Sequence, residues 1–454
     1  MDPRKLLDTQ SRPNMTTERQ RESREDPLPR GGSFDLIGSQ LGEPFGQKSG
    51  FSVHTNCRVC RTALLLPYLD LGDQPLANGL VSADALAVEN ETRYPLAVAL
   101  CPECGLSQLT VAVDPKILYT HYRFSSGVSR AWLVHCQELA NSVISEKGFS
   151  GFVVDIAAND GSQLNQFRSA DWKLLGVEPS DVPTLMVGAH PNEVRANIPI
   201  IRQFWSQAVA DQIRREHGPV DVVIAQNVFG HVADPVEFLK ATKSVLAEDG
   251  QIVIEVPDVG DMIDNLAFDT IYHEHLSYWN GLALERAAEA SGLRVKKLEQ
   301  FPDIHGGTVR YWLEHRDGAT QFERSPLVSD TVYTAFAQRV SHTIDLTSSI
   351  ISGIEKTKFL AWGASAKGAV MMNAIYNRWP RATFPRAVID QTPEKQGLLT
   401  PGVHIPVIAP PDDLSDVDVI WVLSWNWLPQ IRAQAEQRGF SGKYLVTSPS
   451  PRLV

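Results

Sequence analysis

The sequence predicts an α/β protein of several domains, and three observations support this fold class. At 152–167 a continuous apolar run gives way to small residues and then to a helical pattern, which predicts a strand, a tight turn and a helix. The same succession returns at 358–375. Two CxxC pairs precede the first of these segments, so we expect a metal-binding unit followed by two α/β domains.

Length and composition narrow the functional classes. With 454 residues and 43% hydrophobic side chains, the chain can form two or three compact cores. A net charge of −11 argues against a nucleic-acid partner, which requires a basic surface, and favours a small-molecule substrate. There is neither an apolar run of about 18 residues nor an apolar signal core, which predicts no membrane association and a cytoplasmic location.

Residues 1–50 are dominated by charged and polar side chains, as in SRPNMTTERQRESREDPLPRGG. Too little apolar surface can be buried here to offset the entropy lost on ordering. We expect a disordered extension.

Four cysteines form the pairs Cys57/Cys60 and Cys101/Cys104, a spacing typical of two knuckles around one tetrahedral zinc ion. All four ligands come from the protein, so the predicted zinc is structural and has no open position for a substrate. The 40 residues between the pairs predict an inserted hairpin or loop. The alternative is four unrelated buried cysteines.

A helical pattern over 130–146 precedes the first α/β segment. It contains the fifth cysteine, Cys136, which stands alone and is expected in the core. Another helical pattern over 282–293 leads into a predicted strand at 294–301.

The turn at 157–161 is a candidate binding loop. Ala158 and Gly161 would let the backbone approach a ligand closely, while Asn159 and Asp160 offer polar contacts at a helix start. The stretch matches neither the GxGxxG dinucleotide motif nor a Walker motif.

The next apolar segment, 173–180, predicts a strand that ends at Glu178. A carboxylate at the carboxyl end of a second strand can accept hydrogen bonds from two ribose hydroxyl groups. Together with the loop at 157–161, this favours a nucleoside-bearing cofactor. Similar strand, turn and helix segments also occur in α/β proteins that bind nothing there, which is the alternative.

Segments 220–235 and 251–258 continue the alternation with buried strands. Asn227 and His231 follow the first strand, and Glu255 is expected at the end of the second. Ligands of open α/β sheets bind at the carboxyl ends of the strands, so we expect these residues near a site.

The stretch FDTIYHEHLSYW at 268–279 is the candidate centre for acid/base chemistry. It places Tyr272, His273, Glu274 and His275 in a row. Histidine exchanges a proton readily near neutral pH, and a neighbouring tyrosine or carboxylate can orient it or carry the proton onward. The alternative is a loop whose histidines satisfy backbone groups, but four such groups in succession favour function.

A further cluster, IHGGTVRYWL at 304–313, contains Gly306 and Gly307, which permit a sharp turn. Arg310 could pair with a phosphate or a carboxylate. His305 is either a substrate ligand or the cap of the turn.

Residues 317–357 predict a connecting helical segment, and residues 358–454 a second domain with a parallel sheet. The first strand of that domain leads through small residues into a helix, where backbone N–H groups and Lys367 would form a cradle for a substrate phosphate. The loop lacks the P-loop ending GK[ST], so a hydrolysed triphosphate is not expected. An ordinary small-residue turn is the alternative.

In combination these motifs resemble a known family, the zinc-containing, S-adenosylmethionine-dependent C-methyltransferases of deoxysugar biosynthesis, which methylate nucleotide-linked keto sugars. The resemblance runs from about Cys57 to the C-terminus and rests on the order and number of short motifs. These are the CxxC pairs with CPECGLSQL, HYRFSSGVSRA, DIAANDG, GVEPS, NVFGHVADP, FDTIYHEHLSYW, IHGGTVRYW, GASAKG and PGVHIPV. The most specific are YHEHLSYW and HGGTVR.

The resemblance implies S-adenosylmethionine and structural zinc as cofactors. The implied organisation is a disordered extension at 1–50, a zinc-binding domain at 51–120, a class I methyltransferase domain at 121–316, a connecting segment at 317–357 and a C-terminal Rossmann-like substrate-binding domain at 358–454.

Residue by residue, the resemblance implies a general base at His275 and further catalytic residues at Tyr272, Glu274 and His231. The cofactor-binding residues would be Ala158, Asn159, Asp160, Gly161, Glu178 and Asn227. The expected substrate-binding residues are His305, Arg310 and Lys367. Two departures are Ala158, where the family usually has serine, and Ser424-Trp425-Asn426, where it has Pro-Trp-Asn; the second leaves sugar specificity open.

A carbon next to a ketone becomes nucleophilic only after it loses a proton, so C-methylation needs a base and a group that stabilises the enolate. We therefore expect His275 to take the proton from such a carbon of a nucleotide-linked keto-deoxysugar. The alternatives are a C-methyltransferase for a non-sugar enolisable or aromatic metabolite, a non-catalytic zinc-stabilised binding protein and, least favoured, an RNA methyltransferase. We expect a monomer or a weak homo-oligomer.

Overall fold

The computed structural model describes residues 50–119, 130–182, 198–304, 306–316 and 325–454, and every structural statement refers to these. They all belong to one compact unit, Glu43–Val454. The predicted extension, apart from its last residue, most of the HYRFSSGVSRA motif and His305 lie outside the described residues.

The first described elements form two antiparallel sheets. β1 (Phe51–Val53) pairs with β5 (Val111–Val113). A second sheet has the order β11-β4-β3-β2 and contains β2 (Leu66–Pro75), β3 (Arg93–Leu100), β4 (Ser107–Leu109) and β11 (Ser277–Tyr278). The insertion predicted between the CxxC pairs is therefore a long hairpin, β2 and β3, with helix α1 (Ala85–Glu89) in its connection.

A seven-stranded sheet forms the central unit. Its strands are β6 (Ser150–Ile156), β7 (Asp171–Val177), β8 (Ile200–Ile201), β9 (Val220–Gln226), β10 (Leu246–Pro257), β12 (Leu293–Phe301) and β13 (Thr308–His315). They lie in the order β12-β13-β10-β9-β6-β7-β8, parallel from β8 to β10, with β13 antiparallel to both neighbours. Successive strands leave β6 first toward β7 and then toward β9, and open α/β sheets bind ligands at such a switch point.

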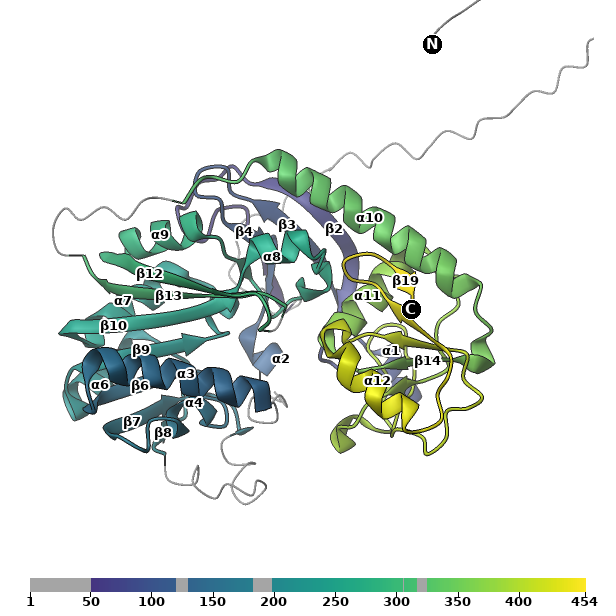
Figure 1. Cartoon of the computed structure of the whole chain (residues 1–454). Coiled ribbons are helices and arrows are strands. Elements are labelled where there is room, and N and C mark those ends of the chain that lie inside the picture. Colours follow the sequence, from purple (N-terminus) through teal and green to yellow (C-terminus); the bar gives the residue numbers. More distant parts are fainter. Residues whose placement is uncertain (1–49, 120–129, 183–197, 305, 317–324) are drawn as a thin grey trace, which may run out of the picture. The chain divides into compact units, whose positions relative to one another are not determined.

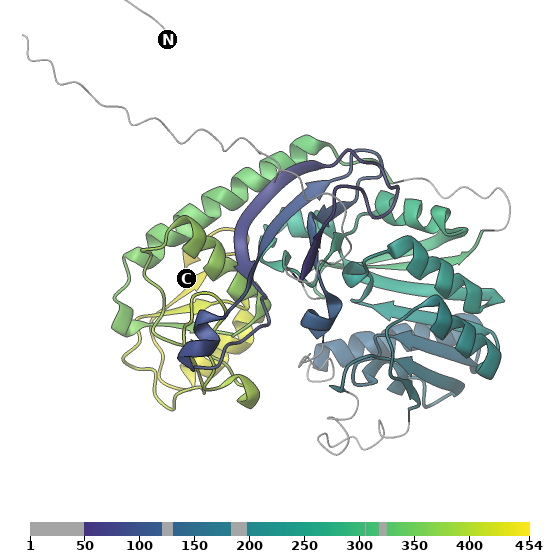
Figure 2. The same ribbon diagram turned by 180° about the vertical axis from the view of Figure 1, so that it is seen from behind.

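Helices cover both faces of this sheet. One core cluster contains apolar side chains of α3 (Arg130–Lys147) and α4 (Ser162–Asn165), with α3 in front in Figure 1. The other cluster contains those of α6 (Gln207–His217), α7 (Pro235–Val245) and α9 (Gly281–Ala290), which are better seen in Figure 2. Cys136 of α3 is fully buried, as predicted.

β10 differs from the strand predicted at 251–258. It begins at Leu246 and includes the residues for which the sequence predicted a turn. The pairing with β9 is irregular between Leu246 and Gln251. Because β10 runs on to Pro257, Glu255 lies inside the strand and not at its end. Helix α8 (Val259–Asp264) follows.

The last part of the described chain forms a second α/β unit. It comprises the helices α10 (Asp330–Ser352), α11 (Ala366–Arg378) and α12 (Leu428–Glu436) and the strands β14 (Phe359–Trp362), β15 (Val388–Ile389), β16 (Val407–Ile408), β17 (Val419–Val422), β18 (Lys443–Val446) and β19 (Arg452–Leu453). The sheet order is β16-β15-β14-β17-β18-β19. The prediction of a parallel sheet is wrong only for β19, which is antiparallel to β18.

The β2–β3 hairpin shares a core with this second unit. Leu69 of β2, Phe268, Phe336 of α10 and Met372 of α11 belong to one cluster of buried apolar residues. The α10 helix runs along β2 in both views of the chain (Figures 1 and 2). Residues near the start of the 268–279 stretch are therefore packed between the hairpin and α11.

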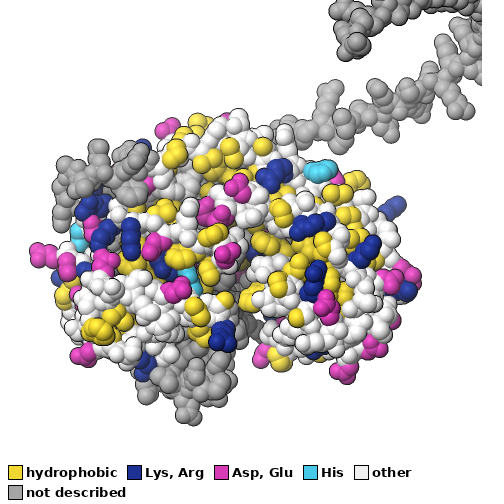
Figure 3. Space-filling view, viewed as in Figure 1, with side chains coloured by type: hydrophobic (Ala, Val, Ile, Leu, Met, Phe, Trp, Pro, Cys, Tyr) yellow, Lys and Arg dark blue, Asp and Glu magenta, His cyan; other side chains and the backbone are white. Residues whose placement is uncertain are grey.

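The described surface carries charges of both signs. On the face drawn in Figure 3, Lys and Arg side chains alternate with Asp and Glu side chains among apolar ones. Such mixing gives that face no strong field of a single sign. Among the described helices, none combines the length and the apolar character that crossing a membrane requires.

Candidate active site

The four paired cysteines converge. Their Sγ atoms all lie within 4.8 Å of one another, with Cys57 and Cys104 3.5 Å apart and Cys60 and Cys101 3.4 Å apart. Four sulfur atoms at about 2.3 Å from a zinc ion would be separated by about 3.8 Å. The cluster therefore fits the predicted zinc ion.

Each knuckle is closed by a backbone hydrogen bond from the residue after its second cysteine. The N–H of Arg61 donates to the Cys57 carbonyl at 3.1 Å, and that of Gly105 to the Cys101 carbonyl at 2.9 Å. Cys57, Cys101 and Cys104 belong to the core cluster that includes α6, α7 and the central sheet. The cluster is thus part of a hydrophobic core, as suits a structural metal site.

Glu178 follows β7 directly and its side chain is buried. Its Oε2 accepts a hydrogen bond from the Asn159 N–H at 3.0 Å, and its Oε1 from the Ser180 N–H at 2.8 Å. The carboxylate therefore joins the loops after β6 and β7. Each oxygen has a second lone pair, so Glu178 can accept two ribose hydroxyl groups.

The loop after β6 has an unusual backbone. Ala157, Asn159 and Gly161 adopt φ angles of 60°, 50° and 76°. The left-handed region is uncommon for residues other than glycine, and strain of this kind concentrates at ligand sites. Ala158 instead buries its side chain in the core beside Leu164.

Asn227 and His231 follow β9. The backbone of Asn227 has a φ of 54°, and its N–H donates to the Glu255 carbonyl at 2.8 Å. His231 ends the short 3-10 helix η3 (Phe229–His231). The predicted cofactor residues thus follow three neighbouring strands, β6, β7 and β9.

Sequence reasoning missed Asp155, the last but one residue of β6. Its side chain is buried, and desolvation together with the charges of Glu178 and Asp160 raises its pKa well above the usual value. Three carboxyl groups therefore meet at this edge of the sheet, where a positively charged ligand would relieve their repulsion. A carboxylate within the apolar run FVVDIA was the signal that could have indicated it.

The partly buried imidazole of His275 has a defined tautomer. Its Nδ1 lies 2.7 Å from the carbonyl oxygen of Thr270. A carbonyl only accepts, so Nδ1 carries the proton and Nε2 keeps its lone pair. Burial, aided by the charge of Lys367, lowers the pKa of His275 to about 4, so the ring is uncharged near neutral pH.

Two further predicted residues surround His275. The ring centroid of Tyr272 lies 4.0 Å from that of His275, and the centroid of His231 lies 5.0 Å from it. Burial, followed by the charge of His275, lowers the pKa of His231 to about 3. Tyr119, at the end of α2 (Pro115–Tyr119), stacks on His231 at 6.1 Å.

Glu274 is held from a distant part of the chain. Its Oε1 accepts a 2.7 Å hydrogen bond from Nδ2 of Asn78, in the connection between β2 and β3. Burial raises the pKa of Glu274 to about 7, although that bond opposes the rise. Asn78 was missed because in the sequence it is only one of several turn residues.

His273 faces away from this group. Its Nε2 lies 3.3 Å from the Pro95 carbonyl oxygen, and its ring centroid lies 5.7 Å from that of Tyr94. For this member of the row, the interpretation as a histidine that serves the backbone fits the structure.

Lys367, the second residue of α11, approaches the same region. Its Nζ is buried, lies 4.4 Å from the ring centroid of Trp425 and has no hydrogen-bond partner among the described residues. Trp425, in the 3-10 helix η7 (Trp425–Trp427), donates from Nε1 to Oδ2 of Asp269 at 2.9 Å. Burial lowers the pKa of Lys367 and raises that of Asp269, and each charge opposes the shift of the other.

The backbone cradle predicted before α11 is partly filled by the protein itself. The Ala364 N–H donates to Oδ2 of Asp390 at 2.9 Å, and Nζ of Lys395 lies 3.3 Å from the same oxygen. A substrate anion would therefore meet Lys367 more readily than this part of the loop.

Arg310 is engaged inside the central sheet. Its Nε donates to Oε2 of Glu255 at 2.9 Å, and its Nη2 lies 2.9 Å from Nε2 of His135. The three side chains are at most 2% exposed. The guanidinium group of Arg310 therefore forms a buried ion pair with Glu255, and we do not assign it to substrate binding. Gly306 and Gly307 do form the predicted turn, with φ of 95° and 110°.

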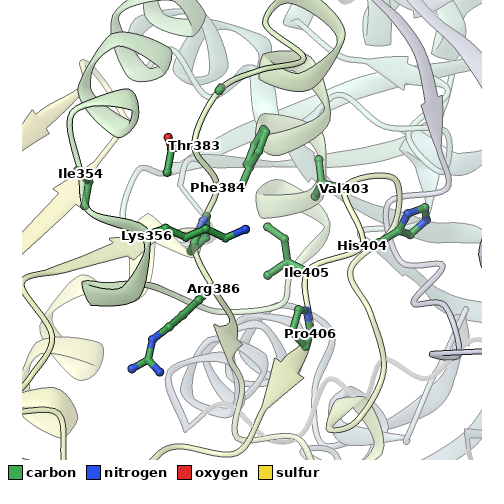
Figure 4. A pocket seen from close by; sticks show the side chains of 11 residues that line it. Ile354, Lys356, Thr383, Phe384, Arg386, Val403, His404, Ile405 and Pro406 are labelled. Carbon is green, nitrogen blue, oxygen red and sulfur yellow. The ribbon is translucent and has the colours of Figure 1, made fainter.

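A pocket of about 520 Å³ lies elsewhere in the second α/β unit. Figure 4 shows Lys356 reaching across it toward Ile405, whereas Arg386 points away. These residues precede β14, β15 and β16, at the amino ends of the strands. Ligands of open α/β sheets bind at the opposite ends, so we exclude this pocket from the candidate site.

Three family models match successive parts of the chain. A model described as "Putative zinc binding domain" matches residues 57–119, one described as "Methyltransferase domain" matches 131–298, and one described as "C-methyltransferase C-terminal domain" matches 303–449. Together with the sheet order, these matches confirm the predicted fold class. The domain boundaries remain predictions.

The chain is also similar to individual proteins of known sequence or structure. The chain is 28% identical over 417 residues to C-methyltransferase NovU from Streptomyces niveus, covering 88% of this chain and 96% of that protein. Among solved structures, PH0226 from Pyrococcus horikoshii OT3 is 13% identical, with 42% of this chain and 94% of that chain covered and a TM-score of 0.34. Magnesium protoporphyrin IX methyltransferase from Synechocystis PCC 6803 is 11% identical, with coverages of 40% and 78% and a TM-score of 0.30.

Proposed function

We propose that this chain, an S-adenosylmethionine-dependent C-methyltransferase whose successive parts match three family models, methylates a carbon next to the ketone of a nucleotide-linked keto-deoxysugar. S-adenosylmethionine and structural zinc are its cofactors. The observation that carries the proposal is the state of His275. It is a partly buried, uncharged imidazole with Nδ1 bonded to Thr270 and Nε2 left as a base.

The cofactor residues are proposed from the carboxyl ends of β6, β7 and β9. Glu178 would accept the ribose hydroxyl groups, with Ala158, Asn159, Asp160, Gly161 and Asn227 around the rest of the molecule. When bound, the cofactor supplies a methyl group on a positively charged sulfur. The cluster of Asp155, Asp160 and Glu178 suits that charge.

The reaction begins with removal of a proton from carbon. Nε2 of His275 accepts the proton, and the electron pair of the C–H bond moves to the carbonyl oxygen to form an enolate. Tyr272 and His231 pack against the imidazole and fix its direction. The nucleophilic carbon must then lie in line with the methyl group at roughly 3–3.5 Å, which binding of both molecules by fixed residues provides.

Glu274 supplies a second group that exchanges protons near neutral pH. Its raised pKa of about 7 means that it is protonated in part of the molecules under physiological conditions. A carboxyl group in that state can orient the substrate by donating or accepting a hydrogen bond. We therefore assign it to the catalytic group with His275.

The sugar substrate is supported by Lys367, whose buried ammonium group has no hydrogen-bond partner in the described part of the chain and suits an anionic or oxygen-rich ligand. Trp425 contacts it, which brings the segment that departs from the family pattern to the substrate side. Because this segment departs from the family pattern, a non-sugar enolisable or aromatic substrate is the competing candidate.

Turnover assays separate these substrates. The enzyme is incubated with S-adenosylmethionine and either a nucleotide-linked 4-keto sugar, keto acids or aromatic compounds, and mass spectrometry locates the new methyl group. We expect methylation of carbon in the sugar. Methylation of a keto acid or an aromatic compound without turnover of the sugar would reject the proposed substrate and retain the activity.

A further inference from the structure

We propose that Lys367 is a catalytic residue whose ammonium group binds the substrate oxygen that becomes negative on proton removal, while Asp269 and Trp425 position it. This inference rests on the proposed function and deepens it. It names the group that stabilises the enolate, a role that neither the family matches nor the motif assigns.

The first observation is a buried ammonium group with unused donors. Nζ of Lys367 is removed from solvent and forms no hydrogen bond among the described residues. A buried charge is unfavourable unless an opposite charge or hydrogen bonds compensate it. Three N–H groups are therefore held ready for a negatively charged ligand.

The second observation is the frame around this group. The Trp425 ring lies under Nζ at 4.4 Å and, through Nε1, donates to Oδ2 of Asp269 at 2.9 Å. Asp269 is only 3% exposed, and its other oxygen, Oδ1, has no hydrogen-bond partner among the described residues. The loop at Gly306 closes the frame, since a Cβ there would lie 3.1 Å from Trp425 and 3.8 Å from Nζ.

The third observation is proximity to the base. Asp269, which accepts from the ring beneath Nζ, directly precedes Thr270, whose carbonyl oxygen lies 2.7 Å from Nδ1 of His275. The charge of Lys367 also contributes to the lowered pKa of His275. A base with a pKa of about 4 is poorly matched to a carbon acid, and proton removal then depends on stabilisation of the enolate. If Lys367 bound only a phosphate far from the reacting carbon, it would not stabilise the enolate.

Charge balance follows through the reaction. When the C–H bond breaks, the proton passes to His275 and the electron pair reaches the carbonyl oxygen, where Lys367 compensates the negative charge. With the cofactor bound, the enolate carbon would form its bond to the methyl carbon while the methyl–sulfur bond breaks and its electron pair passes to sulfur, and the C=O bond would be restored. Lys367 stays protonated throughout, and the interaction is strongest while the oxygen is negative.

Other charged groups near the start of α11 are already paired. Asp390 and Lys395 lie 3.3 Å apart beside the loop that precedes the helix. Asp345 of α10 pairs with Arg378 at the far end of α11, with Oδ2 2.8 Å from Nη2. Asp269 and His275 are titratable groups whose pKa values the charge of Lys367 lowers.

The decisive comparison is Lys367→Met against Lys443→Met, an exposed lysine at the start of β18. Deuterium uptake at the carbon flanking the ketone is measured with saturating nucleotide-linked keto sugar and S-adenosylhomocysteine. Loss of one oxyanion donor typically costs about 100–1,000-fold, so we expect a fall of that size in Lys367→Met and none in Lys443→Met. Binding of a nucleoside diphosphate and of S-adenosylhomocysteine should be unchanged in both, which also reports the fold.

The opposite pattern would overturn the inference. If Lys367→Met loses affinity for the nucleoside diphosphate but exchanges at the normal rate when saturated, the lysine holds the phosphates. If the wild type exchanges no nucleotide-linked keto sugar but methylates another ketone, the proposed substrate fails, and the same comparison on that ketone still decides the role of Lys367.

A pH profile of the exchange distinguishes chemistry from a loss of packing. Asp269 raises the pKa of Lys367, so in Asp269→Asn the loss of exchange at high pH should begin at lower pH. Lys367 lowers the pKa of His275, so in Lys367→Met the loss at low pH should begin at higher pH. Wild-type profiles in both variants would contradict the proposed role.

Discussion

Asn78 and Glu274 are 196 positions apart in the sequence, yet Nδ2 of Asn78 donates a 2.7 Å hydrogen bond to Oε1 of Glu274. Asn78 belongs to the insertion between the two cysteine pairs, and Glu274 to the stretch at 268–279. The hairpin of the zinc-binding part therefore reaches the proposed active site and contacts a carboxyl group that we propose to be catalytic.

Replacing Asn78 by alanine should raise the pKa of Glu274 above its value of about 7, because the lost hydrogen bond favours the ionised carboxylate. The limb of the pH-rate profile that Glu274 controls should move to higher pH. NMR of 13C-labelled glutamate checks the shift directly. Asn56→Ala, at an exposed asparagine, is the matched control, and an equal shift in both variants would contradict the contact.

Replacing His275 by glutamine should abolish proton removal. General bases contribute about 100–10,000-fold, so we expect deuterium exchange and methyl transfer to fall together by that order. S-adenosylmethionine binding should persist because its proposed ligands lie in the loops after β6, β7 and β9. His342→Gln, at an exposed histidine of α10, should behave like the wild type. Normal exchange in His275→Gln would remove His275 from the role of base.

Replacing Glu178 by glutamine should weaken the binding of S-adenosylmethionine. Hydrogen bonds to a charged group contribute about 1.5–3 kcal/mol, which corresponds to a roughly 10–100-fold rise in Kd. Isothermal titration calorimetry measures it. Asp181→Asn provides the control, since that side chain is 86% exposed and lies three residues away. Equal affinities of the two variants would show that Glu178 is not a cofactor ligand.

Replacing Cys101 by serine should lower zinc content and thermal stability together. Three of the four cysteines are packed in the core that includes the central sheet, so loss of the metal should destabilise that unit. We expect Tm to fall by more than about 5 °C, given roughly 2–4 °C per kcal/mol in larger domains. Elemental analysis and calorimetry test this. Cys136→Ala should keep its zinc; retention of zinc by Cys101→Ser would refute the ligand set.

The pairing of Arg310 with Glu255 in the central sheet could not be predicted from the sequence. Arg310 stood out as a cation for a ligand, but the antiparallel register of β10 and β13 sets it directly opposite Glu255. His135 of α3 completes the contact. The amino-acid sequence does not specify this pairing, because the register depends on how strands that are distant along the chain align.

The sequence by itself determined the features that depend on neighbours along the chain. The two CxxC spacings determined the four-sulfur cluster, the strand and turn after β6 determined the loop at 157–161, and the row at 268–279 determined the candidate base. These are local because CxxC geometry, hydrophobic periodicity and turn chemistry act over a few residues.

Only the tertiary structure decided which groups act together. In the structure His273 contacts the hairpin, whereas His275 packs against His231. Asn78 donates a hydrogen bond to Glu274. Trp425 contacts both Lys367 and Asp269. These contacts join parts of the chain that pack through a shared hydrophobic core. Burial in that core sets the charge of each group, and no local pattern encodes the burial of a side chain by residues a hundred positions away.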